Sequence, residues 1–125
     1  MINGEQNNMF IYRVEDEFGN GCYRNKAYWV NRIKHHDFNP KYPQPREDKG
    51  INRYVKENEF CGFKDLTQLK QWFNLKEIKR MRKNGYTIHK IEVEAITAYG
   101  QKQCLALIPK LRIKIDENMI FNLPV

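Results

Sequence analysis

The chain has 125 residues, of which 41% are hydrophobic and 13% aromatic, and its formal net charge is +7. This length and composition predict a single folded domain over residues 1–125 and exclude an intrinsically disordered chain. Three cysteines without a Cys-x-x-Cys pair argue against a disulfide framework and a cysteine-ligated zinc site, and no apolar run reaches the length of a membrane span.

The positive charge lies mainly in the second half of the chain. Residues 61–125 hold twelve Lys and Arg against six Asp and Glu. Such a one-sided field suggests an anionic partner, namely nucleic acid, a nucleotide or an acidic protein face, although a basic surface can also serve solubility alone. The first residues lack the basic and apolar regions of a signal peptide, so we expect a cytoplasmic protein without membrane contact.

The first half of the chain predicts a strand, a helix and a long loop. Residues 1–8 are polar and are expected to be flexible. Met9–Glu15 is rich in aromatic and β-branched residues, which is typical of a strand. Apolar residues at helical spacing predict a short helix over 24–34. Residues 35–49 contain three prolines, which exclude a regular helix or an interior strand and predict a loop.

Two helices are predicted in the middle of the chain, after a short buried strand at Glu59–Phe63. Asp65 is a good N-cap for the first helix, with Gln68 as its capping-box partner. Asn74 begins the second helix, Leu75–Lys83, which ends at a glycine. The expected buried stripe of the first helix comprises Leu66, Leu69, Trp72 and Phe73.

The last part of the chain is strand-forming. Tyr86–Ala95, Gln103–Ile108 and Leu111–Ile115 are separated by a turn at Tyr99–Gln101 and by Pro109, and a short tail follows. Together the elements predict an α+β domain. We expect a small, mainly antiparallel sheet of about five strands, with two or three helices packed on it.

The second helix carries a basic stripe. Its four cations lie at i, i+3, i+4 and i+7, which places them on one face. Such a face can dock on nucleic acid or on an acidic protein. Cations are also favoured near a helix C-terminus by the dipole, so a purely solvated face is an alternative. The stripe consists of Lys76, Lys79, Arg80 and Lys83.

Histidine and cysteine give weaker indications. A metal site at His35, His36 and Asp37 would need further ligands from distant segments, so no metal is expected. His36 is a candidate ligand contact from the loop, and a loop histidine without any ligand is the alternative. Cys61 and Cys104 lie in apolar strand-like segments, which favours small buried side chains over nucleophiles.

Several polar and aromatic residues lie within or at the ends of predicted strands. Arg13 lies on the first strand, Phe63 ends a middle strand before a helix, and Gln103 opens a late strand that is followed by Pro109 and a final strand. This order resembles the ADP-ribosyltransferase superfamily. The resemblance implies an ADP-ribosyltransferase-like fold whose pocket takes NAD or another nucleotide, with Arg13 and Gln103 at catalytic positions. It implies ligand contacts from Tyr12, His36, Phe63 and Tyr99.

The sequence departs from that family at two places. Gln103 stands where the family carries a catalytic Glu, and its amide brings no negative charge, so the resemblance leaves catalysis open. Lys64 and Asp65 stand where a Ser or Thr is expected.

A second resemblance covers more of the chain. The Tyr12–Glu15 segment, a Gly-x-Gly-x-Tyr turn at Gly19–Tyr23 and the Cys61–Phe73 segment are similar to small proteins of tailed bacteriophages. This similarity implies action on a host target in the host cytoplasm, including a role against host defences, and attaches no activity.

Two functions therefore remain open. In one, a phage protein binds a nucleotide or NAD-like ligand in an ADP-ribosyltransferase-like pocket, with catalysis lost or retained. In the other, a non-enzymatic phage inhibitor or nucleic-acid-binding module docks through the basic helix.

Overall fold

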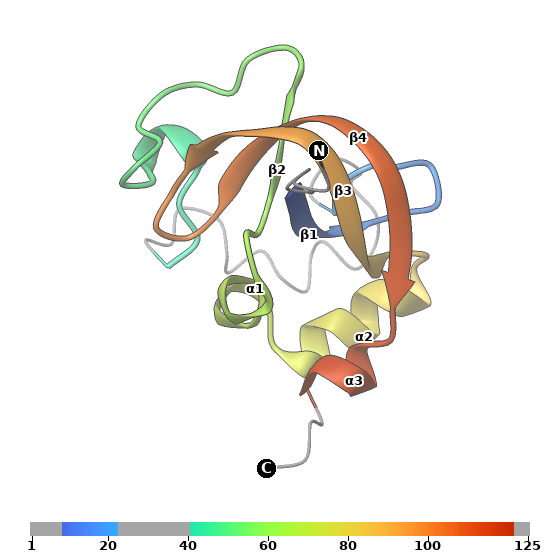
Figure 1. Cartoon of the computed structure of the whole chain (residues 1–125). Coiled ribbons are helices and arrows are strands. Elements are labelled where there is room, and N and C mark those ends of the chain that lie inside the picture. The colour runs from blue at the N-terminus through green and yellow to red at the C-terminus, as the bar shows by residue number, and fades with distance from the viewer. Residues whose placement is uncertain (1–8, 23–40, 122–125) are drawn as a thin grey trace, which may run out of the picture.

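The computed structural model describes residues 9–22 and 41–121, which form an α+β arrangement. A curled antiparallel sheet lies on one side and three short helices lie beneath it (Figure 1). The strands are β1 (Met9–Glu15), β2 (Glu59–Gly62), β3 (Thr87–Tyr99) and β4 (Cys104–Ile115). The helices are α1 (Leu66–Trp72), α2 (Leu75–Lys83) and α3 (Glu117–Phe121).

The sheet curls until its two edge strands touch. The strand order is β1-β3-β4-β2, and every pair is antiparallel. Tyr12 of β1 and Phe63, directly after β2, exchange two backbone hydrogen bonds of 2.7 Å. This single bridge joins the edges, and the strands separate on either side of it. The sheet is therefore a half-barrel with a narrow seam between β1 and β2.

The curl creates two apolar clusters. The inner one packs Ile11, Ile91, Val93, Cys104 and Ala106 against each other inside the curl. A Cβ at Gly62 would lie 2.6 Å from Ile11 Cδ1 and 3.1 Å from the Tyr12 carbonyl oxygen, so the glycine favours this close approach of β2 to β1. The outer cluster joins the opposite sheet face to the helices, and its most deeply buried members are Leu69, Phe73, Ile78, Met81 and Ile88.

The predicted N-caps of α1 and α2 and the glycine stop after α2 are confirmed. Asp65 accepts a hydrogen bond from the Gln68 backbone amide, and Asn74 and Glu77 form a complete capping box. Gly85 has φ +89°, as a glycine stop requires. The expected reciprocal bond from Gln68 is wrong. Its Oε1 accepts from the Lys64 amide, and its Nε2 donates to carbonyls of the β3–β4 turn, so this side chain anchors α1 to the hairpin.

Within the described residues, the expectation of about five strands is corrected to four. The two late strands are one continuous strand, β4, because its backbone passes Pro109 with a bulge and keeps pairing with β3. Lys110 is the unpaired residue of this bulge, and Ile108, directly before Pro109, has φ 53°. The expected tail is also wrong, since α3 follows β4 and Arg82 of α2 forms an ion pair with Glu117. Within the described residues, no helix has the length and apolarity needed to cross a membrane.

Residues 41–50 close over the β3–β4 turn. Apart from a 3-10 turn at Pro45–Glu47 this segment is irregular, as its prolines predicted. The carboxylate of Asp48 accepts hydrogen bonds of 2.8–3.2 Å from three successive backbone amides, those of Gln101, Lys102 and Gln103. Gly100 permits this contact, because a Cβ there would lie 2.5 Å from Asp48 Oδ2. The predicted helix over 24–34 and the loop residues 35–40 lie outside the described residues.

Candidate functional site

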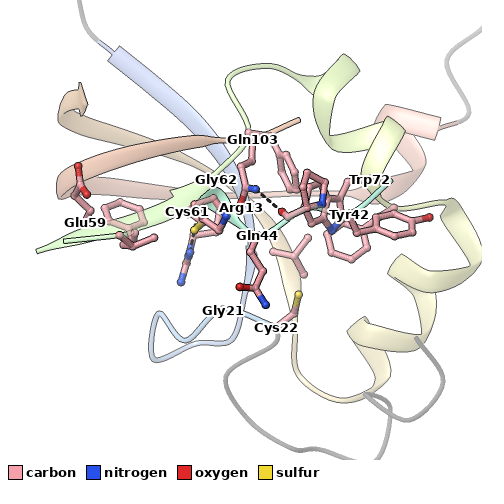
Figure 2. Close-up of a pocket in the computed structure, with 17 residues that line it drawn as sticks. Arg13, Gly21, Cys22, Tyr42, Gln44, Glu59, Cys61, Gly62, Trp72 and Gln103 are labelled. Atoms are coloured by element: carbon pink, nitrogen blue, oxygen red, sulfur yellow. Dashed lines mark hydrogen bonds between the residues drawn. The ribbon is translucent and has the colours of Figure 1, made fainter. Parts of the chain in front are cut away.

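A cavity of about 570 Å³ lies at the seam of the half-barrel. Its walls are β1 just past the bridge, β2, the end of α1 and the segment 42–45. In Figure 2, Arg13 and Gln103 lie between Glu59 at one end of the cavity and Tyr42 and Trp72 at the other. This volume falls within the roughly 300–1,000 Å³ typical of small-molecule sites.

Arg13 spans the seam and carries the main positive charge of the cavity wall. Its Nη1 donates to the Cys61 carbonyl oxygen at 2.5 Å, and its Nε donates to Glu15 at 3.1 Å. Glu15 is fully buried and also accepts from Arg112 Nε of β4 at 2.5 Å. Two guanidinium groups thus share one buried carboxylate. Arg13 Nη2 donates to no group in the described part of the chain, so it remains able to bind an anion.

Gln103 presents a buried acceptor. The residue is only 5% exposed, and its Nε2 donates to the Pro43 carbonyl oxygen at 2.7 Å. That acceptor determines which amide atom is nitrogen. Oε1 accepts no hydrogen bond from residues 9–22 or 41–121. An unsatisfied buried acceptor costs about 1–3 kcal/mol, and an N–H or O–H group entering the cavity would satisfy it.

Aromatic rings form much of the remaining wall. The Arg13 guanidinium lies over the Phe60 ring, 5.2 Å from its centroid. At the other end Trp72 contacts both Tyr42 and Phe63, with ring centroids 5.5 Å apart in each pair. Flat apolar faces beside a cation suit a ligand that combines a planar ring with an anionic group.

The carboxylate in the lining is already engaged. Both oxygens of Glu59 accept from Arg53 at 2.8 Å, and Glu59 also accepts from Thr97 and from the Lys56 amide. The Arg53 hydrogen bonds hold the pKa of Glu59 well below its usual value. An ionised carboxylate with this many donors is a structural anchor and a poor general acid or nucleophile.

The cysteine thiols are not activated. Cys22 and Cys61 line the cavity, whereas Cys104 lies in the inner cluster. Burial raises the pKa of Cys22 and of Cys104 to about 12, and it also raises the pKa of Cys61. Thiols of raised pKa are weak nucleophiles. The expectation of a buried apolar role is confirmed for Cys104, while Cys61 is only partly buried.

The sequence-predicted ligand residues divide into two groups. Arg13, Phe63 and Gln103 line the same cavity. Tyr12 instead packs against the helix-covered cluster, and Tyr99 is 55% exposed at the end of β3, so neither belongs to the lining. His36 lies outside the described residues.

The basic stripe of α2 lies elsewhere. Its lysines are exposed and Arg80 is half-exposed, and none of the four lines the cavity. The stripe and the cavity are therefore separate surfaces. The residues concerned are Lys76, Lys79, Arg80 and Lys83.

Several contributors to the site were not predicted from the sequence. Glu15 accepts hydrogen bonds from both Arg13 and Arg112, so Glu15 and Arg112 position the Arg13 side chain. Tyr42 and Trp72 form one end of the cavity. For Glu15 and Arg112, the sequence offered one signal only. Glu15 is a charged residue in a predicted strand that has apolar residues on both faces. Within residues 9–22 and 41–121, no cluster of His, Cys, Asp or Glu is arranged to hold a metal ion.

Comparison with known proteins shows the family. The family model described as the bacteriophage T4 Y00F protein matches residues 9–112, a range that includes Arg13, all of β2 and Gln103. No curated protein and no solved structure matches the chain. The chain therefore belongs to the bacteriophage T4 Y00F protein family.

Proposed function

We propose that this phage protein binds a nucleotide-class ligand at the seam without transferring a group from it. The observation that carries the proposal is the pairing of two unsatisfied polar groups in one aromatic-walled cavity. Arg13 Nη2 offers a donor to a phosphate, and Gln103 Oε1 offers an acceptor to a base or sugar. The aromatic rings offer surfaces for stacking.

The resemblance of the sequence to ADP-ribosyltransferases supports the choice of a nucleotide as the ligand. NAD belongs to the class that the cavity fits, because it joins planar rings to a pyrophosphate. Group transfer is not proposed, since the amide of Gln103 brings no negative charge to a developing cation and Glu59 is held by Arg53. The same proposal includes action on a host target. A host defence that signals through nucleotides is one such target.

The test is calorimetric titration of NAD, ATP, ADP, AMP and cyclic dinucleotides at up to millimolar concentration. We expect at least one to bind and to raise the melting temperature. Gln44→Glu places a negative charge in the cavity wall from an exposed position and should weaken binding about tenfold. Gln71→Glu makes the same change on the exposed surface of α1, outside the lining, and should leave binding unchanged.

Two outcomes would overturn the proposal. The first is the absence of binding by every nucleotide at millimolar concentration. The second is equal binding by the Gln44→Glu and Gln71→Glu variants, which would place the ligand elsewhere. Release of nicotinamide from NAD by the purified protein would refute the part that excludes group transfer.

The basic helix supports a second candidate function, docking on an acidic host protein or on nucleic acid. Lys76, Lys79 and Lys83 are exposed and form no ion pair within the described residues. Reversing these three charges should abolish binding, and affinity for nucleic acid should fall steeply as salt rises. If nucleic acid still binds after the charge reversal and at high salt, this candidate function is excluded.

A further inference from the structure

The outer half of β4 has a neighbour on one side only. β2 pairs with residues Cys104–Leu107 and then ends, whereas β3 continues to pair as far as Ile115. Among the described residues, no strand pairs with the other side of Leu111–Ile115. Such an edge offers backbone N–H and C=O groups to an added strand.

The side chains of this edge alternate in a simple way. Leu111 and Ile113 lie on one sheet face and are 53% and 48% exposed. Arg112 and Lys114 lie on the other face and are also exposed. Lys110 at the bulge adds a further exposed cation. The edge therefore presents an apolar row on one face and a positive row on the other.

This pattern excludes a second copy of the same edge as its partner. In an antiparallel pair centred on Arg112, one guanidinium would face another, and Lys110 would face Lys114. Like charges directly opposite each other destabilise a sheet, and lysines on an edge are a common protection against self-pairing. The occupant must carry the opposite charge.

We propose that Leu111–Ile115 docks an extended acidic segment of a partner protein as an additional strand of the sheet. The segment alternates Asp or Glu, set beside Arg112 and Lys114, with aliphatic residues set beside Leu111 and Ile113. Backbone pairing supplies affinity and the two rows supply register, as in other cases of strand addition. Nucleic acid would engage the cations but would leave Leu111 and Ile113 in water, so it fits this edge less well.

The experiment uses the full chain and a synthetic peptide of about eight residues that alternates glutamate and valine. Peptide with the same composition in two blocks keeps the charge and removes the alternation. We expect the alternating peptide to bind, and its binding to protect amides of Leu111–Ile115 from hydrogen exchange. A single-stranded oligonucleotide serves as a polyanion without a peptide backbone.

The variants separate this edge from the other basic surface. Lys110→Glu with Lys114→Glu should weaken peptide binding about tenfold or more, because two attractions become repulsions. Lys49→Glu with Lys64→Glu makes the same charge change at exposed residues outside both β4 and α2 and should have no effect. Lys76→Glu with Lys79→Glu reports any peptide binding at α2. Leu111→Ser with Ile113→Ser should weaken binding without loss of the fold, since both side chains are about half exposed. Arg112 is left intact because it supports Glu15.

Three results would overturn the proposal. One is the absence of binding by the alternating peptide, and another is equal binding by the block peptide. The third is preference for the oligonucleotide combined with loss of binding in the α2 variant, which would assign the contact to nucleic acid at α2. Nucleotide binding in the cavity is expected to survive the β4 variants, so failure here and failure of the proposed function are distinguishable.

Discussion

Replacement of Asp48 by Asn tests how the loop before β2 is attached to the β3–β4 hairpin. Asp48 is 1% exposed, and its two oxygens accept from the amides of Gln101, Lys102 and Gln103. Asn keeps one oxygen and replaces the other with an NH₂ group, which would face a backbone N–H. One charge-assisted hydrogen bond is worth about 1.5–3 kcal/mol, and a buried unsatisfied donor costs about 1–3 kcal/mol. We expect a loss of about 3 kcal/mol in the free energy of unfolding.

Urea denaturation measures this loss. With a slope of about 2 kcal/mol per molar urea, the midpoint should fall by about 1.5 M. The matched control is Asp65→Asn, because Asp65 accepts from one amide at a helix N-cap, where Asn is as effective as Asp. If the two variants differ by less than about 1 kcal/mol, the amides of the turn are satisfied without the carboxylate and the reasoning is refuted.

Three further changes test the charges and thiols around the seam. Glu15→Gln removes the carboxylate shared by two guanidinium groups and should lower the free energy of unfolding, measured in urea, by about 2–3 kcal/mol. A loss below about 1 kcal/mol would show that both arginines rehydrate freely. Arg53 lowers the pKa of Glu59, so this ion pair stabilises the fold above the ordinary value of 4.5 and the stabilisation is lost as pH falls below it. Glu59→Gln should therefore reduce the dependence of the melting temperature on pH between about pH 5 and pH 3. If this pH dependence is the same in the variant, the ion pair does not contribute as argued. Iodoacetamide at pH 8 should modify Cys61 slowly and Cys104 not at all before unfolding, whereas rapid labelling of Cys104 would show that its thiol is reactive.

Local chemistry in the sequence determined the secondary structure closely. Met9–Glu15 forms β1 with the predicted bounds, and α2 runs from Leu75 to Lys83 as predicted. Both follow from neighbours in the chain, since a capping box joins residues three apart and strand propensity depends on consecutive side chains. The continuous β4 was missed because Pro109 indicates a break unless the partner strand accommodates a bulge, and that depends on β3.

The composition of the seam was decided by the tertiary structure. Arg13 and Arg112 share Glu15 although β1 and β4 lie at opposite ends of the chain, and Gln103 donates to Pro43 across 60 residues. Contacts of this kind depend on the curl of the sheet, which brings its two edges together at one bridge. Sequence patterns report burial and local conformation, and it was the resemblance to ADP-ribosyltransferases that indicated Arg13 and Gln103 as candidate catalytic residues. Only the curl of the half-barrel determined that Arg13 and Gln103 line one cavity, because their convergence depends on the register and twist of the whole sheet.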